Sequence, residues 1–129
     1  MQIEPLVSRS ILTVKNSDSL HHAAVAMMER GVGSAVVITD GKPTGIITDR
    51  DALRVIARGA DPKTLKVADC VKRTLKTVTG AMDVVEAANM MRETGFRQLV
   101  VVDDKGVLTG VFSMRDLVVG LLQERAVTA

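Results

Sequence analysis

The chain has 129 residues, of which 47% are apolar and 25% charged, a composition typical of one globular domain and not of a disordered segment. A formal net charge of +2 and the absence of Trp and Tyr argue against a nucleic-acid-binding surface, which needs concentrated basic charge and aromatic stacking platforms. A single cysteine, Cys70, excludes an internal disulfide, and the adjacent His21 and His22 lack the spacing of a helical metal-ligand pair.

The N-terminal ten residues and the hydropathy of the whole chain bear on localisation. Residues 1–10 include Glu4 and Arg9 and lack the apolar core of a signal peptide. No segment approaches the roughly 18 uncharged apolar residues that a membrane-spanning helix needs. We therefore expect a soluble, cytoplasmic protein without membrane contact.

The first half of the chain is predicted to form a strand, a helix, two strands and a second helix, in this order. A short strand near 13–14 precedes a helix that Ser19 would cap and Gly31 would end in a left-handed conformation. The β-branched run at 35–39 predicts a strand buried on both faces. Residues 40–43 predict a turn, residues 45–48 a further strand, and a second helix begins near Arg50. The apolar face of the first helix would consist of Leu20, Ala23, Ala24 and Met27.

The same order follows in the second half. Residues 59–75 form a link, with a short helix predicted at 62–70. A strand at 77–78 then precedes a helix that begins at Asp83, with Glu86 at the spacing of a capping box, and that ends at Gly95. Strands follow at 99–102 and 107–113, joined by a turn at 103–106, and a last helix begins near Arg115. The pairs Met27–Met28 and Met90–Met91 are expected to pack on helix faces, at the interface between the repeats or at a dimer interface.

The chain contains an internal repeat. Residues 13–41 align with 77–105, and 45–53 align with 110–118, with Gly45/Gly110, Arg50/Arg115 and Asp51/Asp116 among the identical pairs. A duplicated β-α-β-β-α unit of mixed α and β class is therefore predicted. Because each copy by itself is too small to bury its sheet, the two copies are expected to pack on each other as one module over 1–129, with repeats at 5–59 and 66–125.

Two motifs carry a resemblance to a known family. They are Gly45-Ile-Ile-Thr-Asp-Arg-Asp51 and Gly110-Val-Phe-Ser-Met-Arg-Asp116, which end the same element order in both copies. The chain resembles a tandem pair of cystathionine-β-synthase-type (CBS) domains, a Bateman module. This resemblance implies a non-catalytic module that dimerises. It also implies two clefts between the repeats for adenosine-type ligands, namely AMP, ADP, ATP or S-adenosylmethionine.

The residues of such a site can be named from the motifs. The carboxylates of Asp51 and Asp116 suit a ribose diol, and the hydroxyls of Thr48 and Ser113, with the helix amides that follow them, suit a phosphate or ribose oxygen. Arg97 in the second copy aligns with Gly33 in the first. Because Arg97 adds a positive charge, the second cleft is expected to bind phosphate better than the first. The remaining candidate ligand residues are Arg50 and Arg115 for a phosphate tail, and Ile11, Thr13, Ser34, Ala35, Leu75, Thr77, Gln98 and Leu99 around the base.

Other interpretations stay open at this stage. Asp51 and Asp116 can act as helix caps alone. The pairs Asp49/Asp51 and Asp103/Asp104 can hold Mg²⁺ as an accessory to a nucleotide, although no metal site is expected otherwise. One functional hypothesis is a stand-alone sensor that transmits occupancy to an unidentified effector protein, and the alternative is a ligand-free dimerisation scaffold. An enzyme is disfavoured, because both histidines lie in one helix turn and cannot complete a nucleophile-base-orienter set.

Overall fold

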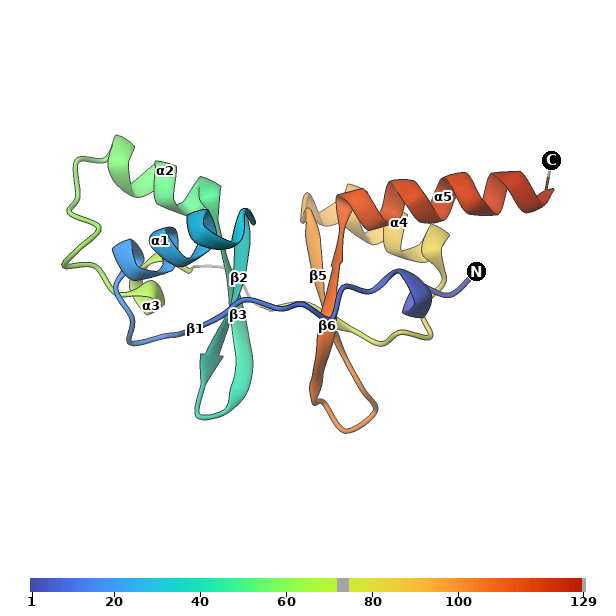
Figure 1. The fold of residues 1–129 in the computed structure, drawn as a ribbon, viewed down its shortest axis with the longest axis horizontal. Coiled ribbons are helices and arrows are strands. Elements are labelled where there is room, and N and C mark those ends of the chain that lie inside the picture. Colours follow the sequence, from blue (N-terminus) through green and yellow to red (C-terminus); the bar gives the residue numbers. More distant parts are fainter. Residues whose placement is uncertain (72–74, 129) are drawn as a thin grey trace. The chain divides into compact units, whose positions relative to one another are not determined.

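The computed structural model describes residues 1–71 and 75–128 and divides into two compact units (Figure 1). The first-repeat unit spans Ile11–Leu75. The second-repeat unit combines Met1–Ser10 with Lys76–Ala129. The N-terminal segment thus precedes the first repeat in sequence but packs with the second. Residues 72–74 of the predicted link lie outside the described part.

The first-repeat unit contains a three-stranded sheet with two main helices on one of its faces (Figure 1). Its elements are β1 (Thr13–Lys15), α1 (Leu20–Arg30), β2 (Ser34–Thr39), β3 (Lys42–Thr48), α2 (Asp49–Ala57) and the short α3 (Val67–Cys70). The second-repeat unit repeats this plan. Its elements are the 3-10 helix η1 (Glu4–Leu6), β4 (Thr77–Val78), α4 (Val84–Thr94), β5 (Gln98–Val102), β6 (Leu108–Ser113) and α5 (Met114–Thr128).

Both sheets have the same strand order and register. The opening strand runs parallel to the central one, and the central strand pairs antiparallel with the last, in the orders β1-β2-β3 and β4-β5-β6. Each central strand carries an irregularity at the same place, between Val37 and Ile38 or between Val101 and Val102. The predicted β-α-β-β-α order is therefore confirmed in both copies. The structure adds that both central strands carry the same irregularity.

The first helix of each unit forms as its sequence predicts. Ser19 Oγ accepts from His22 N at 3.0 Å at the start of α1, and Gly31 ends that helix with φ +65°. Gly95 ends α4 with φ +75°. Because αL conformations are strained for residues with a Cβ, glycine at these two positions fixes where the helices stop. The buried residues of the two helices are Leu20, Ala23 and Met27 in α1, and Val84, Ala87 and Met91 in α4.

The segment that precedes each repeat packs in the unit of the other repeat. Ile3 is fully buried in the core of the second-repeat unit, where its amide donates to Met82 O at 2.9 Å. Val67 occupies the matching place in the first-repeat unit, and its amide donates to Asp18 O at 2.8 Å. The N-terminal segment also adds to the edge of the second sheet, since Ser8 and Val111 exchange two backbone hydrogen bonds of 3.0 Å.

Several predicted boundaries were wrong. Helix α3 covers only Val67–Cys70 because residues 61–65 form a turn, in which Leu65 N donates to Asp61 O. Strand β3 already begins at Lys42, because the hairpin turn needs only the two residues 40 and 41, whose φ angles of 51° and 78° are both positive, as a type I′ turn requires. Strand β6 begins at Leu108, one residue later than predicted.

One capping prediction needed correction. Asp83 caps α4 through a bond from Val85 N at 3.0 Å, and the reciprocal bond to Glu86 that would complete a capping box is not formed. Of the first methionine pair, Met27 is buried in the core, whereas Met28 is 81% exposed on the outer side of α1. Cys70 is buried as expected, and its Sγ donates to Lys66 O at 3.3 Å.

Candidate functional site

The first candidate site lies where β1, β2, β3 and the start of α2 meet, at one end of the sheet of the first-repeat unit. Ser34 at the start of β2 pairs with Thr48 at the end of β3. Leu12 O, just before β1, accepts from Val36 N at 2.9 Å. The turn into α2 is anchored by Asp49 N, which donates to Gly33 O at 3.0 Å. The elements that meet here carry the predicted residues Ile11, Thr13, Gly33, Ser34, Ala35, Thr48, Arg50 and Asp51.

A capping box fixes the carboxylate of Asp51 at the start of α2. Its Oδ2 accepts from Thr48 N at 2.9 Å and from Thr48 Oγ1 at 3.1 Å, while Asp51 N donates to Thr48 Oγ1 at 3.4 Å. Its Oδ1 accepts from Arg54 Nη1 at 2.9 Å. The Asp51 side chain is only 14% exposed, against 42% for that of Arg54. Both carboxylate oxygens are therefore already engaged within the helix.

The first amides of α2 are also occupied. Asp49 N donates to Gly33 O, Arg50 N to Asp49 Oδ1 at 2.9 Å, and Asp51 N to Thr48 Oγ1. The sequence interpretation assigned such amides to a phosphate or ribose oxygen. At this helix start they already have acceptors from the protein.

The second candidate site has the same frame at the start of α5. Ser113 pairs with Gln98, and Met114 N donates to Arg97 O at 2.8 Å. Asp116 Oδ2 accepts from Ser113 N at 2.8 Å and from Ser113 Oγ at 2.9 Å, and Asp116 N donates to Ser113 Oγ at 3.3 Å. The second unit therefore holds the same hydroxyl-carboxylate pair as the first.

The second helix start is less occupied than the first. Within residues 1–71 and 75–128, Asp116 Oδ1 has no hydrogen-bond donor and Arg115 N has no acceptor. The reason lies in two substitutions between the repeats: Val119 stands at the position of Arg54, and Met114 at the position of Asp49. The second carboxylate therefore presents one oxygen, and its helix one amide, that the first does not.

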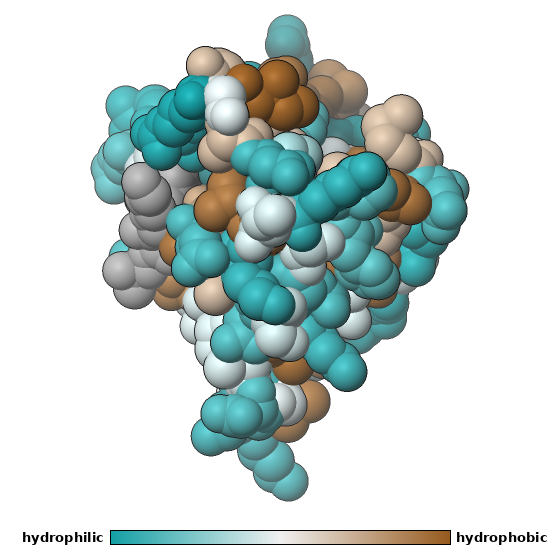
Figure 2. Space-filling view, turned by 90° about the vertical axis from the view of Figure 1, so that its left-hand side faces the viewer, coloured by the Kyte–Doolittle hydropathy of each residue, from teal (hydrophilic) through white to brown (hydrophobic). Residues whose placement is uncertain are grey.

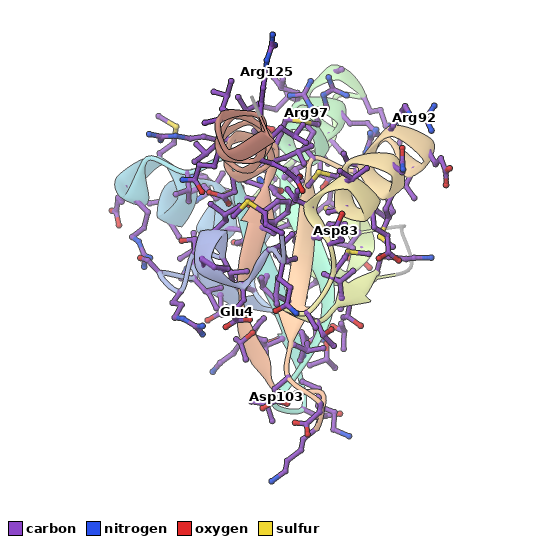
Figure 3. The ribbon with its side chains drawn as sticks, turned by 90° about the vertical axis from the view of Figure 1, so that its right-hand side faces the viewer. Glu4, Asp83, Arg92, Arg97, Asp103 and Arg125 are labelled. Carbon is purple, nitrogen blue, oxygen red and sulfur yellow. The ribbon has the colours of Figure 1, made fainter. Side chains whose placement is uncertain are left out.

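The other predicted residues divide into three groups. Ala35 and Leu99 lie in the hydrophobic cores, with their side chains buried. Leu75 belongs to the first-repeat unit, and the structure does not group it with Thr77, which opens β4. Arg97 is exposed directly before β5, at the opposite end of that strand from Asp103 (Figure 3).

Arg54 and Asp49 are the residues that the sequence interpretation missed as parts of the site. Arg54 lies three residues after Asp51, the spacing at which helix side chains pair. Asp49 Oδ2 lies 3.2 Å from the point that a Cβ on Gly33 would occupy, which brings a second carboxylate to the same corner. The spacing of three residues between Asp51 and Arg54 could have predicted their ion pair. The approach of Asp49 to Gly33 could not be predicted in this way, because it depends on the β2–β3 hairpin.

A separate electrostatic cluster surrounds the amino group of Met1 in the second-repeat unit. The amino group donates to Glu124 Oε1 and to Asp83 Oδ1, both at 3.0 Å. The hydrogen bonds to Glu124 and then to Asp83 raise the pKa of this amino group above its ordinary value of 8.0. The hydrogen bond from the amino group, together with that from Val85 N, lowers the pKa of Asp83 below 3.8.

The described residues form neither a metal cluster nor a membrane-spanning helix. Within the part of the chain that the structure describes, no three His, Cys, Asp or Glu side chains gather closely enough to hold a metal ion. The longest described helix, α5, has 15 residues, and no described helix combines the length and apolarity that a bilayer span requires.

Comparison with known proteins places this geometry in a family. The model of the CBS domain matches twice, at residues 3–58 and 67–122. An uncharacterised protein of Methanopyrus kandleri is 32% identical over 119 residues, which cover 91% of this chain and 61% of that protein. The chain likewise spans only 58% of another relative, the mitochondrial CBS domain-containing protein CBSX3 of Arabidopsis thaliana.

Solved structures agree with the family match. A putative signal-transduction protein with CBS domains from Burkholderia ambifaria has a TM-score of 0.89 and 27% identity, with 95% of each chain covered. A CBS domain protein of Pyrobaculum aerophilum, solved with AMP, has a TM-score of 0.82 and 27% identity over 90% of this chain and 89% of the other. CBSX2, also solved with AMP, has a TM-score of 0.81 and 26% identity, with coverage of 96% and 98%. The duplicated fold, the two family matches and these neighbours together establish that the chain belongs to the CBS domain family and carries a tandem pair of such domains.

Proposed function

We propose that the chain is a non-catalytic regulatory module that binds an adenosine-type ligand and passes its occupancy to an effector protein. One observation carries the proposal: a hydroxyl-carboxylate pair is held in the same geometry at the start of α2 and at the start of α5. Capping explains one oxygen of each carboxylate. The other oxygen, which bonds Arg54 in the first unit and has no donor among the described residues in the second, can accept from the adjacent hydroxyls of a ribose.

The chemistry of the ligand follows from these groups. A carboxylate accepts hydrogen bonds from both hydroxyls of a 2′,3′-diol, and charge strengthens those bonds. Arg50 and Arg115, exposed on the first turns of α2 and α5, supply positive charge for phosphate oxygens. We therefore propose AMP, ADP, ATP or S-adenosylmethionine as candidate ligands. In this scheme Mg²⁺ enters only as the counterion of a nucleotide phosphate.

The comparisons support an adenine nucleotide as the first ligand to test. Two neighbours of similar fold, the Pyrobaculum protein and CBSX2, were solved with AMP. Both cover most of this chain. AMP carries the diol and one phosphate, and so matches both kinds of group at the helix starts.

Isothermal titration calorimetry with AMP, ADP, ATP and S-adenosylmethionine tests the proposal. We expect at least one to bind, and the Asp51→Asn/Asp116→Asn double variant to lose that binding. Asp61→Asn is the matched control, because it removes the same charge at a turn in the link, where Asp61 Oδ1 accepts from Lys63 N at 2.9 Å. Absence of binding by all four compounds at millimolar concentration would contradict the proposal.

Exposed apolar side chains support self-association, which we include in the proposal as a homodimer. In the first-repeat unit they lie on α1 and α2, and some of them are visible near the top of the face shown in Figure 2. In the second-repeat unit they lie on α4 and α5. The exposed members are Val25, Met28, Leu53 and Ile56 in the first unit, and Val85, Met114, Val118, Val119, Leu121 and Leu122 in the second.

The same surface favours the alternative function, a dimerisation scaffold that uses no ligand. Sedimentation velocity of the native chain and of Leu53→Glu separates the two functions when it is combined with the titration. A dimer that Leu53→Glu dissociates, together with nucleotide binding, fits the sensor. A dimer without nucleotide binding fits the scaffold, and a native chain that sediments as a monomer would contradict the homodimer.

A further inference from the structure

The two helix starts share a frame but differ in what already occupies them. At α2, Arg54 bonds the outer oxygen of Asp51 and Asp49 caps the amide of Arg50. At α5, neither group has a counterpart, since Val119 and Met114 stand in their places. A diol that approaches Asp51 must therefore displace an existing ion pair, whereas a diol that approaches Asp116 displaces none from the described residues.

The charges around the two helix starts also favour the second start over the first for a phosphate-bearing ligand. Asp49 and Asp51 bring two carboxylates to the first start, with Asp49 against the backbone of Gly33. The second start has the single carboxylate of Asp116, and Arg97 takes the place of Gly33. Because like charges close to each other repel, a phosphate is disfavoured beside Asp49 and favoured beside Arg97.

We infer that a phosphate-bearing adenosine ligand binds at the second-repeat helix start, and that Asp49 and Arg54 close the first-repeat start to it. Arg54 and Asp49 are then the residues that determine specificity between the two repeats. The inference rests on the proposed function, since it concerns which of the two matching sites takes the nucleotide. It predicts one AMP bound per chain.

Single variants at the two carboxylates test the assignment. Calorimetry with AMP should give one site in the native chain. Asp116→Asn removes a charge-assisted acceptor and should weaken AMP about ten- to a hundredfold, while Asp51→Asn should change the affinity less than about threefold. Circular dichroism and the melting temperature of each variant check that the helix cap survives the change.

A second pair of variants keeps the test independent of the caps. Val119→Arg places a cation three residues after Asp116, where it can bond Oδ1 as Arg54 bonds Asp51. It should weaken adenosine, which has the diol but no phosphate, about two- to fivefold. The reciprocal double variant Asp49→Met/Arg54→Val should add a second AMP site per chain. Arg58→Ala is the matched control, because it removes a cation at the end of α2 without contact to Asp51.

The outcomes separate the two proposals. Two equal AMP sites in the native chain, or a loss of AMP binding in Asp51→Asn as large as in Asp116→Asn, would overturn this inference and leave the proposed function standing. An unchanged adenosine affinity in Val119→Arg would also overturn it. A native chain that binds no adenosine compound would overturn the proposed function, and this inference with it.

Discussion

The burial of Ile3 allows a sharp test of how the chain is divided into units. Ile3 is fully buried and packs in the core of the second-repeat unit, although it precedes the first repeat in sequence. Ile3→Ala removes three buried carbon groups, worth about 0.8 kcal/mol each, or about 2.4 kcal/mol. The cavity left behind adds about 1–2 kcal/mol, so we expect the free energy of unfolding to fall by about 3.5–4.5 kcal/mol.

Urea denaturation measures the total loss, and hydrogen exchange locates it. Faster exchange should appear in α4, β5 and α5, and the amides of β2 and α1 should be less affected, because the substituted side chain lies in the core of the second-repeat unit. Val107→Ala is the control, since Val107 is 56% exposed and its truncation should cost less than about 0.5 kcal/mol. A loss of protection confined to the first-repeat unit would refute the reasoning, and so would a cost equal to that of Val107→Ala.

Two further predictions concern the caps and the N-terminus. Thr48→Ala and Ser113→Ala each remove a hydroxyl that accepts a hydrogen bond from the amide of the third helix residue. Each variant should lower the free energy of unfolding by about 1 kcal/mol in urea denaturation, while Thr48→Ser should cost clearly less. Equal losses for the Ala and Ser variants of Thr48 would contradict this role. The amino group of Met1, with its pKa raised by Glu124 and Asp83, contributes stability that is present below pH 8.0 and is lost as the pH rises through the raised pKa. Asp83, with its pKa lowered, contributes stability that is present above pH 3.8 and is lost as the pH falls through the lowered pKa. Thermal melts from pH 3 to 10 should therefore differ between the native and the N-acetylated chain most in the interval between these values, and coincident melting curves would argue against the cluster.

The repeat, the helices and the two helix starts could be predicted because their causes are local in sequence. Ser19 and Gly31 cap one helix through their own conformational preferences, and the spacing of apolar residues at three and four positions selects the buried face. The hydroxyl-carboxylate spacing of Thr48 and Asp51 fits within one helix turn, so the motif carries its geometry with it. The ion pair of Arg54 with Asp51 is equally local, and the sequence interpretation missed it by considering each motif only up to its acidic residue.

Only the tertiary structure decided which chain segment completes which unit. Ile3, Leu6 and Val7 have the spacing of an apolar helix face, but nothing in the sequence shows that this short segment joins the core of the second-repeat unit and not the repeat that follows it. The same holds for Asp49, whose approach to Gly33 depends on the antiparallel pairing of β2 with β3. Local preferences fix where elements begin and end, but contacts between residues far apart in sequence depend on how the whole chain buries its apolar surface.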